Sequence, residues 1–267
     1  MKGRRLLFVV WGAAVAALFV AKALGPESAI FRDVLTEGVM LRAGGATKLV
    51  FLLVGWRFAA TNAASLEADN PARRPWTFFS RGLLAFALGQ AVLSTYQVVL
   101  GTSPYPSIGD AFFLCAYPLL IAATFGLVRA YREAGYPVGS AREHGALAIV
   151  MGATFAVIGY LLLRPILAMD SPLGERLLTA GYPALDFVWL IPILVLLRIA
   201  TGFRGGRVFR AWAFLLAGTV SQCAGDIFYA YLAVLGQARL DPIVDATYVL
   251  SYLFVGLGTM EHYELLK

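Results

Sequence analysis

The chain contains eight runs of about 20 mostly apolar residues, separated by short polar connections. A helix of about 20 residues spans the hydrocarbon core of a bilayer, and it satisfies its backbone hydrogen bonds internally, as lipid requires. With 60% hydrophobic and 14% charged residues, the chain has less polar surface than a soluble domain of this size needs. The predicted fold is therefore all-α, a polytopic integral membrane protein with eight transmembrane helices near Leu6–Leu24, Leu41–Ala64, Phe78–Leu100, Ala111–Ala130, Ala146–Leu163, Leu178–Ile199, Ala211–Leu235 and Ile243–Met260.

The second half of the sequence repeats features of the first half at a shift of 135 residues. The aligned pairs include Tyr96 with Tyr231, Gly101 with Gly236, Asp110 with Asp245, Phe113 with Tyr248, and Tyr117 with Tyr252. We expect a single membrane domain over residues 1–267, built from two parallel four-helix repeats of about 1–135 and about 136–267. Such repeats are related by an axis along the membrane normal.

The polar connections predict the orientation of the chain. If the N-terminus is cytoplasmic, the connections on that side carry about twice as many Lys and Arg residues as those on the other side, in agreement with the positive-inside rule. The net charge of +6 then reflects topology and attraction to anionic lipid. We expect a retained N-terminal anchor, with the N- and C-termini both cytoplasmic.

Three apolar helices open with the same short phrase, in which a proline precedes an aspartate by three or four residues. The acids are Asp110, Asp186 and Asp245, and the aromatic residues three positions after them are Phe113, Trp189 and Tyr248. Residues three apart lie on the same helix face, so we expect these acids and aromatics, with Tyr252, to line a ligand-binding pocket near the outer helix ends. Alternatively, each acid lies in the first turn of its helix and caps it, and the aromatics form an interfacial belt.

Asp226 lies within the seventh apolar run, ten residues before Gly236. That spacing places its carboxyl group about 15 Å from the predicted outer end of the helix. An acid at this depth is energetically costly and faces protein or water, so it is a hypothesis for a functional site. Candidate partners are Arg57, which we also predict to be a buried charge, Lys48, Gln90 and Gln222. The alternative is a structural hydrogen-bonded pair that stabilises the bundle.

The sequence contains no nucleophile elbow, P-loop or dinucleotide fingerprint. Cys115 and Cys223 lie within apolar runs and are interpreted as packing residues. His144 and His262 are far apart in the sequence, which does not favour a metal site. We therefore predict no catalytic residue, no metal and no cofactor.

The three phrases together resemble the multi-helix membrane domain that precedes GGDEF, EAL or histidine kinase modules in bacteria. The usual pattern of that family is PS-x-x-D-x-x-Y-L-x-x-YPL, then YP-x-x-D, then D-x-x-YAYL with a closing D-x-x-W/Y-x-x-x-Y. The resemblance covers about half of the chain. The matching positions are Pro106, Asp110, Phe113, Tyr117, Pro118, Tyr182, Pro183, Asp186, Asp226, Tyr229, Tyr231, Asp245, Tyr248 and Tyr252.

This resemblance implies a sensor-like protein of the bacterial cytoplasmic (inner) membrane, which binds a small or lipidic ligand or a partner protein near the outer face. In the family an output module follows the membrane domain, whereas this sequence ends at Lys267. We therefore expect no enzymatic activity and signalling to a separate cytoplasmic or membrane protein. Membrane lipids are expected partners and a homo-oligomer is compatible with the pattern. Nucleic acid is not expected, because no basic stripe with interleaved aromatics lies outside the membrane.

Two other functions stay open at this point. One is an accessory or structural subunit of a membrane complex or carrier. The other comes from a weaker resemblance to the lysoplasmalogenase-type membrane hydrolases, which have eight helices, intramembrane acids in GD and SD contexts, and a lysine that opens the second span. Lys48 and Asp226 would fit that pattern, whereas Gln90 stands where its first acid is expected.

Overall fold

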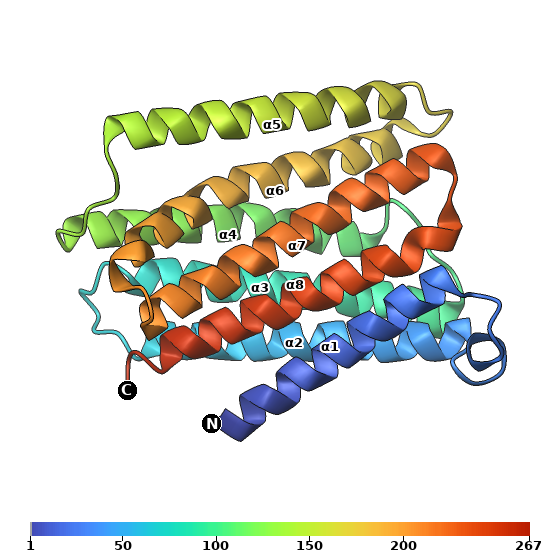
Figure 1. Ribbon diagram of the computed structural model, residues 1–267, viewed down its shortest axis with the longest axis horizontal. Helices are drawn as coiled ribbons and strands as arrows, with labels where there is room; N and C mark the ends of the chain where they lie inside the picture. Colours follow the sequence, from blue (N-terminus) through green and yellow to red (C-terminus); the bar gives the residue numbers. More distant parts are fainter. Residues whose placement is uncertain (1) are drawn as a thin grey trace.

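The computed structural model describes residues 2–267, which form a bundle of long helices (Figure 1). No strand occurs within that range, so the prediction of an all-α chain is confirmed. The elements are α1 (Lys2–Leu24), η1 (Ile30–Val34), α2 (Glu37–Ala64), α3 (Arg73–Thr95), η2 (Tyr96–Leu100), α4 (Ile108–Glu133), α5 (Ala141–Leu167), α6 (Leu173–Ala200), η3 (Thr201–Phe203), α7 (Arg207–Leu235), η4 (Ala238–Leu240) and α8 (Asp241–Tyr263). The turns η1 and η2 are π-helical, and η3 and η4 are 3₁₀-helical.

Seven helices of the described range are long and apolar enough to cross a membrane, namely α1 to α6 and α8. This set of helices is typical of an integral membrane protein. The helix α7 is as long as the others but does not belong to the set. Its apolar run is interrupted by Ser221, Gln222 and Asp226, which lower its mean hydropathy.

The helix α8 occupies the centre of the bundle, where it packs against α7, α2 and α1 (Figure 1). Next to it, α3 packs against α2 and α4, and α6 packs against α7 and α4. The helix α5 lies on the outside, against α6 and α7. Accordingly, 67% of the most apolar stretch of α8 is buried within the protein, compared with 6% of that of α5. Side chains on α8 are therefore largely enclosed by protein, among α1, α2 and α7.

Glycines bring the neighbouring helices close together. A Cβ atom on Gly82 of α3 would lie 2.7 Å from the Leu120 side chain of α4. A Cβ atom on Gly225 of α7 would lie 2.5 Å from Thr247 Oγ1 and 2.8 Å from the Tyr248 ring of α8. Small residues at such crossings let helix backbones approach closely, which is a common way to pack helices in membranes.

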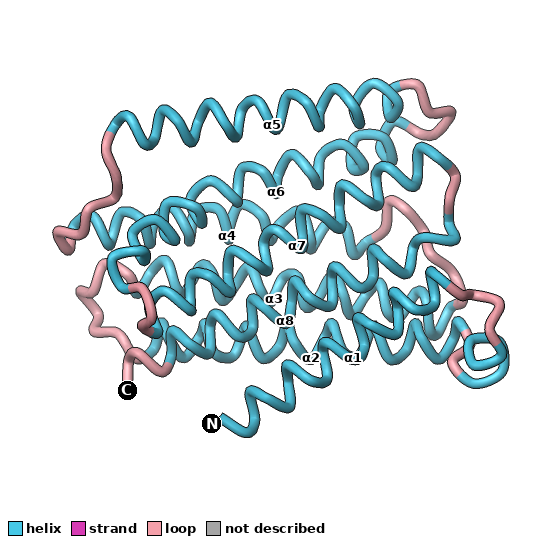
Figure 2. Tube along the Cα trace, in the orientation of Figure 1, coloured by secondary structure: helices cyan, strands magenta, loops and turns pink. Residues whose placement is uncertain are grey.

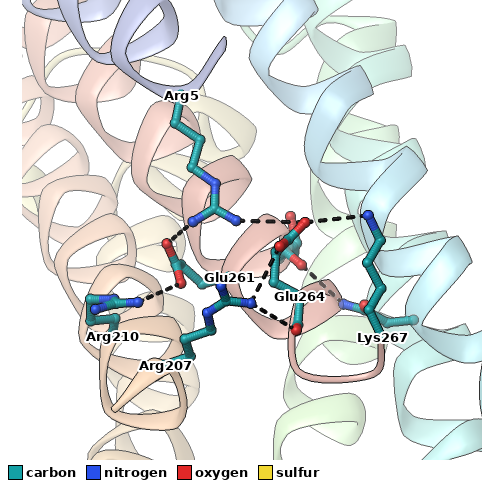
Figure 3. Close-up of polar contacts among 8 residues, drawn as sticks. Arg5, Arg207, Arg210, Glu261, Glu264 and Lys267 are labelled. Carbon is teal, nitrogen blue, oxygen red and sulfur yellow. Dashed lines mark hydrogen bonds and ion pairs between the residues drawn. The ribbon is translucent and has the colours of Figure 1, made fainter. Parts of the chain in front are cut away.

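The connections gather at the two ends of the bundle (Figure 2), and the chain termini lie toward the same end. At that end, the last turn of α8 is held by ion pairs (Figure 3). Glu261 pairs with Arg5 of α1 and, at 3.4 Å, with Arg210 of α7. Glu264 follows α8 and pairs with Arg207 at 3.3 Å. These contacts fix the C-terminal segment against the first and seventh helices.

One predicted helix start is wrong. The phrase from Pro183 to Asp186 was expected to open a helix, but α6 already begins at Leu173, so Asp186 lies in the middle of α6. The segment before the proline contains the helix formers leucine, glutamate, arginine and alanine, and the helix tolerates Pro183 and Pro192 in its interior. Asp186 therefore cannot cap α6.

Candidate functional site

A cavity of about 380 Å³ lies at the end of the bundle opposite to the termini, where α4 and α8 begin and α7 ends. Six tyrosines, four aspartates and one lysine contribute to its wall. The lining residues are Lys48, Phe86, Gln90, Leu93, Gln97, Ser103, Pro104, Tyr105, Ser107, Asp110, Phe113, Tyr117, Thr179, Tyr182, Gln222, Asp226, Tyr229, Asp241, Val244, Asp245, Tyr248 and Tyr252.

Asp110 lies in the first turn of α4 and accepts three hydrogen bonds. Its Oδ2 atom accepts from the Ser107 backbone N–H at 2.6 Å and from the Ser107 hydroxyl at 2.8 Å, as part of a capping box. Its Oδ1 atom accepts from the Tyr182 hydroxyl of α6 at 2.7 Å. The carboxylate thus stabilises the start of α4 and joins α4 to α6, and it also contributes to the cavity wall.

Asp245 is paired with Lys48, whose Nζ donates to Asp245 Oδ1 at 2.8 Å. The lysine comes from α2 and its side chain is only 6% exposed, whereas the Asp245 side chain is 28% exposed to the cavity side. A lysine buried within an apolar helix needs an anionic partner. The pair therefore ties α2 to α8 at the cavity.

Asp226 forms the inner part of the cavity wall. Its Oδ1 atom accepts from the Tyr248 hydroxyl at 2.5 Å, and its Oδ2 atom accepts from the Tyr117 hydroxyl at 3.2 Å. Gln222, one turn earlier on α7, donates to Oδ2 at 3.5 Å. Asp226 precedes the end of α7 by nine residues, which corresponds to about 14 Å along the helix. The cavity thus extends from the end of the bundle toward its middle.

Asp186 lies behind this wall and does not line the cavity. Its side chain is fully buried, and its Oδ1 atom accepts from the same Tyr117 hydroxyl at 2.8 Å. Its Oδ2 atom has no hydrogen-bond partner in the part of the chain that the structure describes. Trp189, on the same helix, is also buried away from the cavity, with its ring 6.5 Å from that of Phe86.

Aromatic rings form the remaining wall. Phe86 lies at the centre of a ring cluster, with ring centroids 5.9 Å from Phe113, 5.5 Å from Tyr117 and 6.3 Å from Tyr252. Tyr105, in the connection before α4, is hydrogen-bonded to the Thr179 hydroxyl at 3.3 Å. Burial raises the pKa of the Tyr105 hydroxyl above its usual value, so this group stays neutral.

The structure brings five of the seven predicted pocket residues to one cavity, namely Asp110, Phe113, Asp245, Tyr248 and Tyr252. The other two, Asp186 and Trp189, are buried outside the cavity lining, and since α6 begins at Leu173 they lie within that helix rather than at its outer end. The role of all seven in ligand binding stays a prediction.

The predicted buried charge at Arg57 is wrong. Arg57 is exposed and hydrogen-bonded to Thr61 on its own helix. It follows Lys48 by nine residues, and at about 100° per residue nine residues turn the chain to the opposite face of the helix. Because Lys48 faces the cavity, Arg57 faces outward. By contrast, Asp226 is buried, at 6% exposure, and contributes to the cavity.

Sequence reasoning did not assign Lys48, Tyr117 and Tyr182 to the pocket. A lysine inside an apolar run was a usable signal for Lys48, because such a charge requires a buried partner. The tyrosines carried no such signal, since tyrosine in an apolar helix also serves as an ordinary packing residue. Within residues 2–267, no group of three or more His, Cys, Asp or Glu side chains is arranged to hold a metal ion.

No protein-family model, curated protein or solved structure matches the chain.

The chemistry of the cavity follows from its charges and donors. Among the described residues, four carboxyl groups line it, and Lys48 is the single cationic side chain of the lining. Tyrosine hydroxyls and amides supply hydrogen bonds, while tyrosine and phenylalanine rings supply faces that attract cations. The arrangement favours a small ligand that carries a positive charge.

Proposed function

We propose that the chain is a sensor-like integral membrane protein that binds a small organic cation in this cavity. The observation that carries the proposal is the excess of carboxyl groups over cationic side chains in a cavity walled by six tyrosines. Desolvated carboxylates and aromatic faces are the groups by which proteins hold ammonium ligands. The volume of about 380 Å³ is in the lower part of the range of small-molecule sites, so the ligand is small.

The proposal includes eight spans in two parallel four-helix units, with α7 as the eighth span. Equivalent contacts support it: a Cβ atom on Gly89 of α3 would lie 2.7 Å from Phe113, and one on Gly225 of α7 would lie 2.8 Å from Tyr248. Both helical stretches also end in a left-handed glycine, Gly101 with φ 63° and Gly236 with φ 64°.

The two units differ by one residue between these landmarks. The stretch from Gly89 to Gly101 is one residue longer than that from Gly225 to Gly236. The π-helical turn η2 lies within the longer stretch, and a π turn is the usual way for a helix to accommodate an extra residue. In this alignment Asp226 corresponds to Gln90, which faces the same cavity.

The proposed orientation places both termini in the cytoplasm of a bacterial cell and the cavity toward the outer face. The excess of Lys and Arg in the connections at the termini supports it, as does the resemblance to bacterial sensor domains. The proposed signal passes to a separate protein through the segment from Glu261 to Lys267, which comprises the last turn of α8 and the residues after it; α8 also carries Asp245 and Tyr248.

A membrane hydrolase of the lysoplasmalogenase type is a second candidate. It is favoured by one observation, that Lys48 and Asp226 line the same cavity. This candidate predicts turnover of lysolipids by the purified protein and its loss in Asp226→Asn. The proposed sensor binds its cation without such turnover, so assaying lysolipid cleavage separates the two functions.

The test of the proposed function is thermal unfolding of the purified full chain in detergent with choline or tetraethylammonium. Dimethylbutanol, the neutral carbon isostere of choline, is the control because it has the same shape without the charge. At a concentration of 100 times the Kd, a bound ligand stabilises the protein by about 2.7 kcal/mol. We expect stabilisation by the cations and not by the isostere. Equal effects of choline and dimethylbutanol, or no effect of either cation, would contradict the proposal.

A further inference from the structure

Two carboxyl groups at the inner end of the cavity share one hydrogen-bond donor. The Tyr117 hydroxyl lies 2.8 Å from Asp186 Oδ1 and 3.2 Å from Asp226 Oδ2. A hydroxyl has one proton to donate, so it serves one of the two acids at a time. The shared hydroxyl brings the two carboxyl groups together, and among the described residues the buried Asp186 Oδ2 atom has no hydrogen-bond partner. Both side chains are more than nine-tenths buried.

Among the described residues, no cationic side chain faces the pair to balance two carboxylates. The titratable groups that face it from the packed elements are Tyr105 before α4, Tyr117 on α4, Tyr182 on α6, Cys223 and Tyr229 on α7, and Tyr248 and Tyr252 on α8. The nearest cation of the cavity wall, Lys48 on α2, is paired with Asp245. Two adjacent buried carboxylates cannot both be ionised without such balance.

We propose that Asp186 and Asp226 together hold one proton, and that a cation binding in the cavity displaces it. The proposal rests on the proposed function. Asp226 lines the cavity and is the acid that a cation reaches, whereas Asp186 lies behind it. On binding, the proton between the two carboxyl groups leaves through the cavity to water, and the charge of the cation replaces it. The carboxyl O–H bond breaks, water takes up the proton, and the net charge of the site is conserved because the cation replaces the proton.

Exchange of this kind makes cation binding depend on pH. As the pH falls, the proton competes more strongly with the cation, and the affinity decreases. For one proton displaced per cation, the Kd increases about tenfold for each pH unit on the acidic side of the protonation midpoint. The site would therefore respond to protons and cations together.

The experiment uses choline and tetraethylammonium, which have no titratable proton, so every proton released comes from the protein. Proton release is measured with an indicator dye in weakly buffered detergent solution, and the amount of bound cation by calorimetry. We expect one proton per cation from the natural chain. Asp186→Asn should still bind both cations, with no proton release and a Kd that is the same in acidic and alkaline buffer. Asp170→Asn, a matched charge change in an exposed connection, should release one proton like the natural chain.

The outcomes separate this inference from the proposed function. Binding without proton release, and with a pH-independent Kd, overturns the proton pair and leaves cation binding standing. Failure of both probes to bind overturns both. If Asp186→Asn does not fold, proton release by the natural chain and the pH dependence of its Kd still test whether the two acids share a displaceable proton.

Discussion

The two ends of α8 show two different uses of acidic residues. At the end near the termini, Glu261 and Glu264 contact cations directly, with partners from α1 and α7 and from the C-terminal residue Lys267 (Figure 3). At the other end, Asp245 has Lys48 as its partner. Asp110 and Asp226, also in the cavity wall, have tyrosine hydroxyls, an amide and a backbone N–H among their donors.

We propose that the bundle uses its acids in two ways, for stability at one end and for ligand binding at the other. An acid with two arginine partners has its negative charge compensated and joins helices. An acid whose donors are tyrosine hydroxyls has no cation beside it. Its negative charge stays uncompensated at the open cavity, where a bound cationic ligand would neutralise it. The contrast between the two ends of α8 leads to four predictions.

The largest effect is expected for Asp226→Asn. Removal of a desolvated carboxylate that contacts a cation costs about 2 kcal/mol or more, so the Kd for choline should increase about 30-fold or more. Calorimetric titration of the purified variant measures the change. Asp170→Asn, with the same change of charge in an exposed connection, is the control. An unchanged Kd for choline in Asp226→Asn would show that the cation does not use this acid.

Gly225→Ala tests the close contact of α7 and α8. The added methyl group would lie 2.5 Å from Thr247 Oγ1 and 2.8 Å from the Tyr248 ring, so the helices must separate. Overpacking costs about 1–3 kcal/mol, and the displaced Tyr248 would also weaken cation binding. Thermal unfolding measures the first effect and titration with choline the second.

The control for this variant is Gly152→Ala on α5, where a Cβ atom would meet no neighbour within 4 Å. That change should be neutral or stabilise slightly, since alanine has the higher helix propensity. A Gly225→Ala protein as stable as the control would contradict the close packing.

Glu261→Gln tests the paired end. The variant leaves Arg5 and Arg210 without their buried acid, although both arginines keep access to solvent. We expect a loss of about 1–2 kcal/mol in the free energy of unfolding, between the values for exposed and buried pairs. The Kd for choline should not change, because Glu261 lies at the opposite end of α8. A higher Kd for choline without a loss of stability would contradict the roles assigned to the two ends of α8.

Arg198→Gln is expected to have the smallest effect. Arg198 and Glu143 join α6 to α5 with an ion pair at 2.7 Å, and both side chains are 46% exposed. Exposed pairs contribute about 0–1 kcal/mol, so the melting temperature should change little and less than in Glu261→Gln. A larger loss than in Glu261→Gln would mean that attachment of α5 limits the stability of the bundle.

Local sequence patterns predicted the helices well where a start signal was unambiguous. The Pro106–Asp110 phrase predicted the start of α4, and the structure places a capping box there. The similar phrase at Pro183 failed, because a helix can continue through a proline when the residues before it are already helical. Lipid around the helices also makes it difficult to predict which helix face packs against the protein. The outward face of a helix such as α5 is as apolar as its packed face, so hydrophobicity does not indicate which side turns inward.

The candidate site could be predicted only in part, because some of its contacts join helices that are distant in the sequence. Same-helix spacing correctly grouped Asp110 with Phe113, and Asp245 with Tyr248. The contacts of Asp226 come from Tyr117 on α4 and Tyr248 on α8, which are distant in the sequence, and no local pattern specifies them.

The central claim is that the cavity itself selects a cation, and thiol protection tests it most directly. In a Cys115→Ser background, which removes the exposed natural thiol, Gln97→Cys places a reactive thiol in the cavity wall. The rate of its modification by a neutral, water-soluble thiol reagent is measured with choline, with tetraethylammonium, or with dimethylbutanol. We predict that the two cations slow the modification and that the neutral isostere does not. Equal protection by the isostere, or no protection by either cation, would contradict the account.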